Sequence, residues 1–294
     1  MRLDVAVRIS YLANRRHRMR IANLKVIVAS LVVGLTLAGI ASAETFPSGS
    51  TMEAIQKKGK VVVGTSLDGP GFSLLNPTTN KAEGFEIDLA KYLAKRLTGS
   101  ESNVEFVPVL SANRFAFVQT GRVDISLATA TINDERKKII GFAGPYYLAG
   151  QDVLVGKNSN IQTLNDLNGK SVCVVTGTDS AANLLKVAPK AEIHSLADEK
   201  SCAEAVSDGR FAALTDDGAV LVPFVKLQPD RVRILGKPFT KEPYGIVVKH
   251  DDVQFRNWIN TELETMIKNG EWQRLYDKDL KEFGAAQVPA VERY

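Results

Sequence analysis

The chain has 294 residues, of which 45% are hydrophobic and 24% charged, and a formal net charge of +4. This composition is typical of a globular protein and excludes disordered, collagen-like and all-membrane chains. The length suits one large domain or two lobes.

The first 43 residues differ from the rest of the chain. Residues 1–25 hold seven basic residues and one acidic residue, Val26–Ile40 is apolar, and Ala41-Ser42-Ala43 has the small-x-small pattern of a signal peptidase site. The apolar run is too short to span a bilayer core of about 30 Å comfortably, which disfavours a membrane anchor. We therefore expect residues 1–43 to be a secretory signal peptide and the mature protein to be periplasmic.

Without this leader the charge changes sign. The remaining chain has 30 basic and 32 acidic residues, a net charge of −2. The basic character of the whole chain thus comes from the leader, and no nucleic-acid partner is expected.

The mature chain has two cysteines, Cys173 and Cys202. An even pair in an exported protein usually forms a disulfide, whereas the alternative is two separate buried thiols. Two cysteines without clustered histidines cannot fill a tetrahedral zinc site. We expect a disulfide, no metal and no cofactor.

Hydrophobic patterns in the first half of the mature chain predict alternating strands and helices. The expected elements are helix Met52–Lys58, strand Lys60–Gly64, helix Gly84–Leu97, strand Val104–Val109, helix Ser111–Gln119 and strand Val123–Leu127. This alternation predicts a parallel α/β sheet. The intervening segment Thr65–Asn80 is predicted to be a long loop, and long loops in compact domains are usually functional.

The pattern repeats in the second half. The expected elements are strands Val153–Val155 and Ser171–Val175, helix Asp179–Val187, a short strand at Ile193, helix Glu199–Asp208, strands Ala212–Thr215 and Gly245–Val248, and helices Asp252–Lys268 and Glu271–Lys281. Two such units predict two lobes connected near Ala149–Val155 and Tyr244–Val248. We expect one lobe over residues 44–148 and 245–294, and the other over 149–244.

Signs of catalysis are scarce. His194 and His250 are the mature histidines, and neither lies near a nucleophile elbow or a metal-ligand spacing. A structural or surface role is expected for each, and the sequence offers no general acid or base for an enzyme.

The segment Ala128–Arg136 follows a strand directly, where ligands bind in open α/β sheets. The hydroxyls of Thr129 and Thr131 and a helix start can face an anion, and Arg136 can clamp a carboxylate through two donors. The alternative is a capped helix with a surface arginine.

Two further stretches can face a ligand from the second unit. Thr176–Ser180 follows a strand and opens a helix, although capping by Asp179 or Ser180 also explains it. Asp216 follows the next strand and can accept hydrogen bonds from an ammonium group, while a solvated loop acid is the alternative.

Several motifs in order resemble the family 3 amino-acid-binding proteins of polar amino acid ABC importers, over nearly all of residues 50–284. The closest similarity is to glutamate/aspartate and glutamine binders. The matching motifs are Gly84–Asp88, Gly121–Ile125, Thr131–Arg136, Phe142–Tyr147 and Gly270–Tyr276.

This resemblance implies a type II periplasmic-binding-protein fold, with two α/β lobes joined by a two-strand hinge. It also implies a monomer that is not an enzyme, captures a free amino acid by hinge closure and delivers it to an ABC permease. A dehydratase-like periplasmic enzyme and a ligand-sensing module are the alternatives on the same scaffold.

The resemblance also assigns roles in binding. Arg136 would hold the ligand α-carboxylate, helped by Thr131 and Thr129, with Thr178 reaching it from the other lobe. Asp216 would hold the α-ammonium group.

Two more residues complete the implied site. Arg114 matches a position that contacts the side-chain carboxylate in binders of acidic amino acids, so glutamate or aspartate is the expected ligand. Arg114 also opens a predicted helix, where a cation opposes the helix dipole and needs another reason to be present. Phe72 would pack on the aliphatic part of the ligand, or equally in the core. Ser66 and Gly69 stand where some relatives carry a cation or an aromatic ring that reads the side chain.

Overall fold

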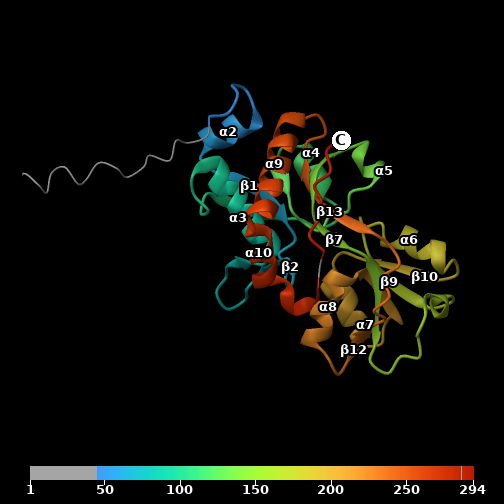
Figure 1. Ribbon diagram of the computed structural model, residues 1–294. Coiled ribbons are helices and arrows are strands. Elements are labelled where there is room, and N and C mark those ends of the chain that lie inside the picture. The colour runs from blue at the N-terminus through green and yellow to red at the C-terminus, as the bar shows by residue number, and fades with distance from the viewer. Residues whose placement is uncertain (1–44, 286) are drawn as a thin grey trace, which may run out of the picture. The chain divides into compact units, whose positions relative to one another are not determined.

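The computed structural model describes residues 45–285 and 287–294, coloured along the chain in Figure 1. The predicted signal peptide lies outside these residues. The chain from Glu44 to Tyr294 forms one compact unit built on two five-stranded sheets. Within the described part, no helix combines the length and hydrophobicity that crossing a bilayer requires.

The first sheet has the strand order β5-β1-β6-β13-β7. Its strands are β1 (Val61–Thr65), β5 (Val104–Pro108), β6 (Ile125–Ser126), β7 (Gly141–Ala149) and β13 (Glu242–Val248). The first three run parallel, as predicted, while β13 pairs antiparallel with both β6 and β7. The sheet is therefore mixed, because β13 returns to it from the far end of the sequence.

Six helices belong to this sheet in the described chain. They are α2 (Thr51–Lys58), α3 (Phe85–Thr98), α4 (Arg114–Gln119), α5 (Asp134–Lys137), α9 (Val253–Asn269) and α10 (Glu271–Asp279). The apolar face of α3, formed by Leu89, Ala90, Leu93, Ala94 and Leu97, is fully buried, and Gly99 ends the helix in the left-handed conformation that glycine favours. Helix α9 packs on β7, and α10 packs on both α9 and α3.

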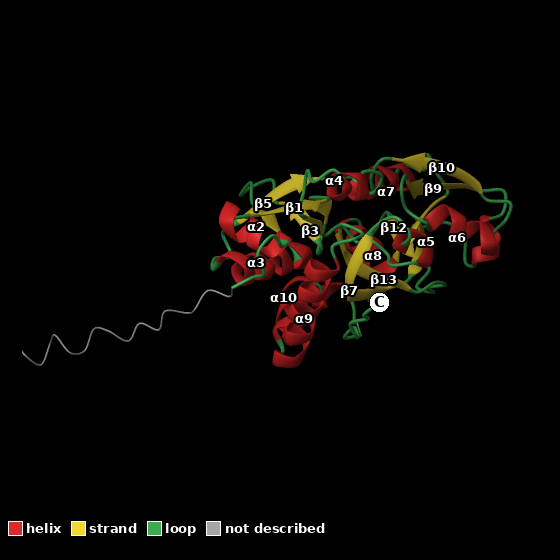
Figure 2. Ribbon diagram, turned by 90° about the horizontal axis from the view of Figure 1, so that it is seen from above, coloured by secondary structure: helices red, strands yellow, loops and turns green. Residues whose placement is uncertain are grey.

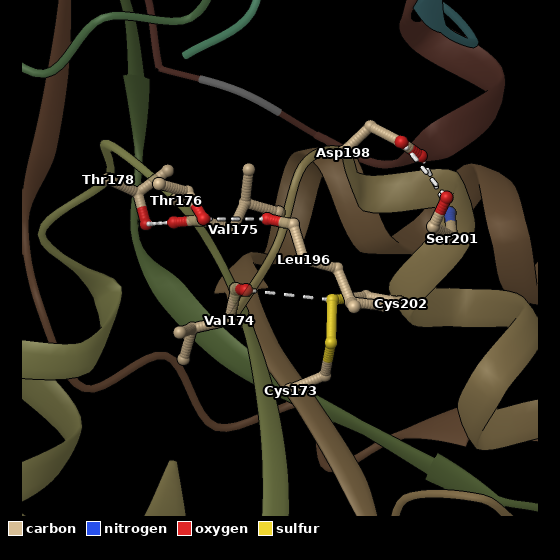
Figure 3. Close-up of a disulfide and its surroundings, with 9 residues drawn as sticks. All are labelled: Cys173, Val174, Val175, Thr176, Thr178, Leu196, Asp198, Ser201 and Cys202. Carbon is tan, nitrogen blue, oxygen red and sulfur yellow. Dashed lines mark hydrogen bonds between the residues drawn. A yellow bond between two sulfur atoms is a disulfide. The ribbon is translucent and has the colours of Figure 1, made fainter. Parts of the chain in front are cut away.

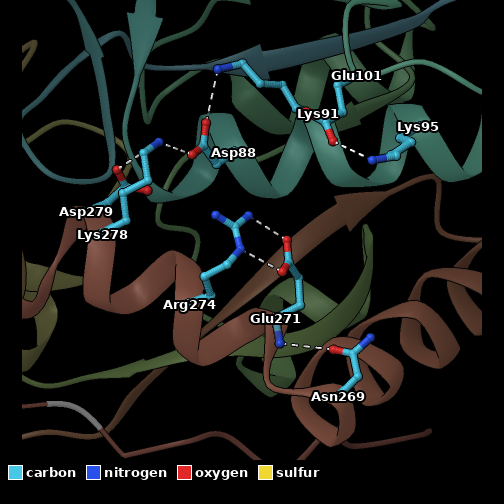
Figure 4. A network of polar contacts seen from close by, with 9 residues as sticks. All are labelled: Asp88, Lys91, Lys95, Glu101, Asn269, Glu271, Arg274, Lys278 and Asp279. Carbon is cyan, nitrogen blue, oxygen red and sulfur yellow. Dashed lines mark hydrogen bonds and ion pairs between the residues drawn. The ribbon is translucent and has the colours of Figure 1, made fainter.

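An ion pair joins α10 to α3, and further pairs lie within each helix (Figure 4). Lys278 pairs with Asp88, whose other oxygen lies 3.0 Å from the Lys91 ammonium group. Within α10, the Arg274 guanidinium lies 2.7 Å from Glu271. Exposed pairs of this kind stabilise by less than about 1 kcal/mol each, so the buried apolar contacts hold the helices and the ion pairs orient them.

The second sheet has the order β10-β9-β11-β8-β12. Its strands are β8 (Gln151–Gly156), β9 (Ser171–Val175), β10 (Glu192–Leu196), β11 (Ala213–Asp217) and β12 (Val232–Ile234). Strand β9 runs parallel to β10 and β11, whereas β8 runs antiparallel to β11 and β12. Figure 2 shows α6 (Ser180–Val187) and α7 (Glu199–Ser207) beside β9 and β10.

The chain passes between the sheets twice, once at Gly150 between β7 and β8 and again between Ile234 and Glu242. At Gly150 the two connections approach closely, since an added Cβ would lie 2.8 Å from the Thr240 carbonyl oxygen. The α/β class with two sheets and two connections is confirmed. The predicted lobe limits stay a prediction, with the limit at Tyr244 falling inside β13.

Other elements were not predicted. A small sheet of β2 (Asp68–Gly69), β3 (Ser73–Leu75) and β4 (Ala82–Glu83) occupies much of the region interpreted as a loop. Helix α8 (Gly218–Leu227) was missed, and it contains Pro223, a residue that normally argues against a helix interior.

Candidate functional site

The loop after β6 adopts a constrained conformation around Thr129. Its φ of 48° is in the left-handed region, which is uncommon outside glycine. The Thr129 backbone N–H donates to Glu86 Oε1 at 2.7 Å, and the Tyr146 hydroxyl donates to the same oxygen. The first turn of α3 therefore supports the loop that was predicted to bind the ligand.

Glu86 was not expected to take part in this support. It is 1% exposed, and burial raises its pKa to about 7. Its Oε2 has no hydrogen-bond partner among the described residues. The sequence signal was available, because Glu86 lies inside the Gly84–Asp88 motif.

Arg136 connects the two sheets. Asn133 caps its helix by accepting from the Arg136 backbone N–H at 2.9 Å. The Arg136 guanidinium donates to the Thr131 carbonyl at 2.9 Å and to the Gly177 carbonyl at 3.4 Å, and lies 3.5 Å from Asp179 Oδ2. Thr131 and Asn133 belong to the first sheet's loop, whereas Gly177 and Asp179 follow β9 in the second.

Arg114 lies next to Arg136 and is 2% exposed. The two guanidinium carbons lie 5.4 and 5.5 Å from the centre of the Phe115 ring. Arg114 Nη1 donates to the Ala128 carbonyl, while its Nε has no partner in the described chain. Burial and, next, the nearby Arg136 lower the pKa of Arg114 to about 10. Two adjacent cations favour an anion between or beside them.

Asp216 lies near the end of β11 and is 6% exposed. Its Oδ1 accepts from the Asp217 backbone N–H at 2.8 Å, whereas its Oδ2 has no partner among the described residues. Burial raises the pKa of Asp216 to about 6; Asp179 adds to the rise, and Arg114 opposes it. This carboxyl group is the counterpart of the arginine pair and can accept hydrogen bonds from a cation.

The turn containing Thr178 touches the first lobe's loop. The Thr178 hydroxyl donates to the Val175 carbonyl at 2.7 Å. The Asn133 side-chain amide donates to Asp179 Oδ2 at 3.1 Å. Thus the predicted residues Arg136, Thr131 and Thr178 lie on segments in direct contact.

Phe72 lies in an aromatic cluster of the core. It is 2% exposed, and its ring centre lies 5.1 Å from that of Tyr147 and 5.8 Å from that of Tyr244. The Tyr244 hydroxyl donates to Asp217 Oδ2 at 2.6 Å, which links this cluster to β11. A direct contact between Phe72 and a ligand stays a prediction.

Two acidic residues near the site were missed, Glu199 and Asp68. Glu199 begins α7, and Asp68 lies on β2, against which α7 packs. Burial, followed by the charges of Asp216 and Asp68, raises the pKa of Glu199 to about 8. The only sequence signal was an acid opening a helix, which is common at any helix N-terminus.

The predicted disulfide between Cys173 and Cys202 is confirmed, with 5.7 Å between the Cα atoms. It joins α7 to β9, the strand that leads into the turn at Thr178 (Figure 3). Asp198 caps the same helix by accepting from the Ser201 backbone N–H at 2.7 Å. The bond and the cap together hold the first turn of α7, where Glu199 lies.

A cavity of about 570 Å³ opens beside these contacts. Its lining comes from both lobes and includes Thr131, Asp179, Asn183 and Glu242. Arg114 and Asp216 do not line it, since both are enclosed. The described residues contain no group of three or more His, Cys, Asp or Glu arranged to hold a metal ion.

Sequence relatives of this chain are named as binding proteins. A glutamine-binding protein of Geobacillus stearothermophilus is 41% identical over 71% of this chain and 79% of its own length. The glutamate-binding protein GluB of Corynebacterium efficiens is 34% identical over 86% of this chain and 89% of its own length.

Solved structures agree with the fold. A solute receptor for L-cysteine of Neisseria gonorrhoeae matches with a TM-score of 0.76 and 32% identity, over 80% of this chain and 95% of that one. The ancestral amino acid-binding protein AncCDT-1, described as a precursor of cyclohexadienyl dehydratase, matches with a TM-score of 0.72 and 36% identity, over 79% and 100%. The predicted type II periplasmic-binding fold is thereby confirmed. Residues 61–282 match the profile of the bacterial extracellular solute-binding proteins, family 3, and the chain belongs to this family.

Proposed function

We propose that this protein captures a free polar amino acid between two lobes and delivers it to an ABC importer in the membrane. The observation that carries the proposal is the bridge made by Arg136, which contacts Gly177 and Asp179 of the other lobe. A ligand that touches both lobes favours the closed state to the extent that it binds that state more tightly.

The charges of the site suit the two ends of an amino acid. Arg136 would hold the α-carboxylate with Thr131, Thr129 and Thr178, and Asp216 would accept hydrogen bonds from the α-ammonium group. Burying both charges of a zwitterion is costly unless each is paired. The unpartnered Oδ2 of Asp216 supports this role, because a buried carboxylate oxygen needs a donor.

The expectation of glutamate or aspartate depends on Arg114. Its Nη1 donates to the Ala128 carbonyl, and its Nε, which has no partner among the described residues, would donate to a ligand carboxylate. Phe72 packs on Tyr147 and Tyr244, and its ring would contact the aliphatic part of the ligand from that position.

Delivery to a permease is supported by the family and by the predicted leader. The permease would recognise the closed arrangement of the lobes, and a monomer would present it. Membership of an extracellular family supports export to the periplasm through the signal peptide of residues 1–43. A sensing module that presents its closed form to a receptor uses the same closure, and a transport assay in cells with and without the permease separates the two.

A second candidate function is an enzyme on the same scaffold. The sequence offered no general acid or base, but Glu199 has a raised pKa beside Asp216. An acid that is protonated at neutral pH can donate a proton in catalysis. Recovery of the bound compound chemically unchanged after long incubation would exclude this candidate, whereas conversion of the compound would establish it.

The experiment that tests the main proposal is calorimetric titration of ligand-stripped protein with single amino acids. We expect one equivalent of a polar amino acid to bind. Absence of binding to every amino acid tested would refute the proposal.

A further inference from the structure

Three acidic residues lie at one end of the site on elements that pack together, because helix α7 packs on both β2 and β11. Glu199 begins α7 and Asp216 lies near the end of β11, both in the second lobe, while Asp68 lies on β2 in the first. Helix α7 packs on β2. Glu199 interacts electrostatically with Asp216 and with Asp68, so the three acids form one group, which we call the acidic end.

Two atoms of the acidic end need a donor. Asp216 Oδ2 and Asp68 Oδ1 are buried and have no hydrogen-bond partner among residues 45–285 and 287–294. Asp216 as a whole is 6% exposed. A buried carboxylate oxygen without a donor is costly, so such atoms point to a group supplied from outside the chain. The α-ammonium group of the ligand would serve Asp216, and Asp68 with Glu199 would remain for another donor.

The cations near this end do not balance it. Arg114 is one cation that interacts with the acidic end. It lies beside Arg136 against the Phe115 ring, in the part of the site suited to a ligand carboxylate. Lys200 interacts with Asp68, but 65% of its side chain is exposed and it lies 3.9 Å from Glu204. A second carboxylate on the ligand would therefore add negative charge to an end that already has a surplus.

We propose that the site selects an amino acid whose side chain ends in hydrogen-bond donors, either an amide or a cation, and that Glu199 and Asp68 bind that end. This inference rests on the proposed function and replaces glutamate or aspartate as the preferred ligand. The shared chemistry is donation to carboxylate oxygens, which glutamine offers through its amide N–H groups and arginine through its guanidinium.

Glutamine and arginine would differ in the number of protons that the protein releases when they bind. Burial and neighbouring acids keep Glu199 protonated near neutral pH, with a pKa of about 8. A ligand cation beside it would lower that pKa and release a proton, whereas an amide would release far less. Titration in two buffers of different ionisation enthalpy counts the released protons and so distinguishes arginine from glutamine.

The deciding experiment is calorimetric titration of the ligand-stripped protein and its Glu199→Gln variant with glutamine, arginine and glutamate. We expect glutamine or arginine to bind the unmodified protein at least about 100-fold more tightly than glutamate, since two lost charge-assisted hydrogen bonds correspond to about that ratio. Glu199→Gln removes the carboxyl group that would ionise beside a ligand donor and leaves an amide that can donate to a ligand carboxylate, so it should shift this ratio toward glutamate by at least about tenfold.

The matched control is Glu204→Gln, which removes an exposed acid of the same helix and should leave the ratio unchanged. Tighter binding of glutamate than of both other probes would overturn the inference while the proposed function stands. An unchanged ratio in Glu199→Gln would also overturn it, because a merely structural Glu199 would weaken all three ligands alike. Failure of all amino acids to bind would refute the proposed function itself.

Discussion

Gly177 of the second lobe lies directly against Ala112 of the first. A Cβ added at Gly177 would stand 2.4 Å from the Ala112 Cα and 2.8 Å from the Ser111 carbonyl carbon. Both neighbours are backbone atoms, which cannot move aside as the end of a flexible side chain can. The approach occurs where Arg136 reaches the Gly177 carbonyl, so the absence of a side chain at this position allows the contact between lobes.

Replacing Gly177 by Ala should therefore impair closure. Open lobes would not meet the added methyl group, so the change acts on the closed state and weakens ligand binding by at least about tenfold. Calorimetric titration with the best ligand measures this loss, and small-angle scattering with saturating ligand should show a larger radius of gyration than for the unmodified protein.

Gly209→Ala is the matched control for this variant. Gly209 has a φ of 74°, close to the 89° of Gly177, but nothing lies within 4 Å of its added Cβ. Both substitutions carry the same conformational cost of about 1 kcal/mol in folding stability. Equal affinities in the two variants would mean that contact with Ala112 has no part in closure.

Arg136→Ala should abolish most binding and leave the fold intact. Helix α5 has no buried residue, and the Arg136 side chain contacts Thr131, Gly177 and Asp179, so its loss removes the proposed carboxylate ligand without opening the core. We expect at least about a 100-fold loss of affinity with an unchanged circular dichroism spectrum. Arg122→Ala is the control, since Arg122 also stacks on a phenylalanine, Phe117 at 4.0 Å, but lies outside the site. Wild-type affinity in Arg136→Ala would contradict the assignment.

The disulfide should contribute to both stability and affinity. The cysteines are 29 positions apart, and closing a loop of this length stabilises the fold by about 3.5 kcal/mol in the chain-entropy model. A Cys173→Ala/Cys202→Ala variant should lose about that free energy of unfolding in urea titrations. Because the bond also holds the α7 turn that contains Glu199, we expect weaker ligand binding even at temperatures where the variant is folded. If the variant binds the ligand as tightly as the unmodified protein, the disulfide has no effect on ligand affinity.

Much of the fold was predictable because local patterns agree with it. The apolar face of α3 follows the helical period, and Val61–Val63 is a continuous apolar run typical of a buried strand; both lie where predicted. Helix α8 was missed because it is nearly continuous in hydrophobicity and contains Pro223, so periodicity carries no signal there. The short strands β2 to β4 have two or three residues each, too few for a pattern.

Part of the candidate site could be predicted from segments that follow predicted strands. The segment with Thr131 and Arg136 follows the predicted strand Val123–Leu127, and Asp216 follows the predicted strand Ala212–Thr215. Glu199 and Asp68 are brought into the site by packing between α7 and β2, a contact between distant parts of the sequence. Acidic residues are common at a helix start and in a polar loop, so the sequence does not distinguish these two. Their part in the site depends on the neighbours that the tertiary structure brings close.

Glu199 should also make stability depend on pH. Its pKa is about 8 in the folded protein, above the ordinary glutamate value, because of burial and then the charges of Asp216 and Asp68; Arg114 opposes the rise. The folded state thus binds this proton more tightly than the unfolded state, so the free energy of unfolding should fall as pH rises from about 4.5 to about 8. Glu199→Gln removes this titration and should raise the free energy of unfolding at pH 8 by at least about 1 kcal/mol, with little change at pH 5. Urea titrations of both proteins at the two pH values test this, with Glu204→Gln as the exposed counterpart on α7. An equal effect of Glu199→Gln at both pH values would show that Glu199 titrates alike in the folded and unfolded states.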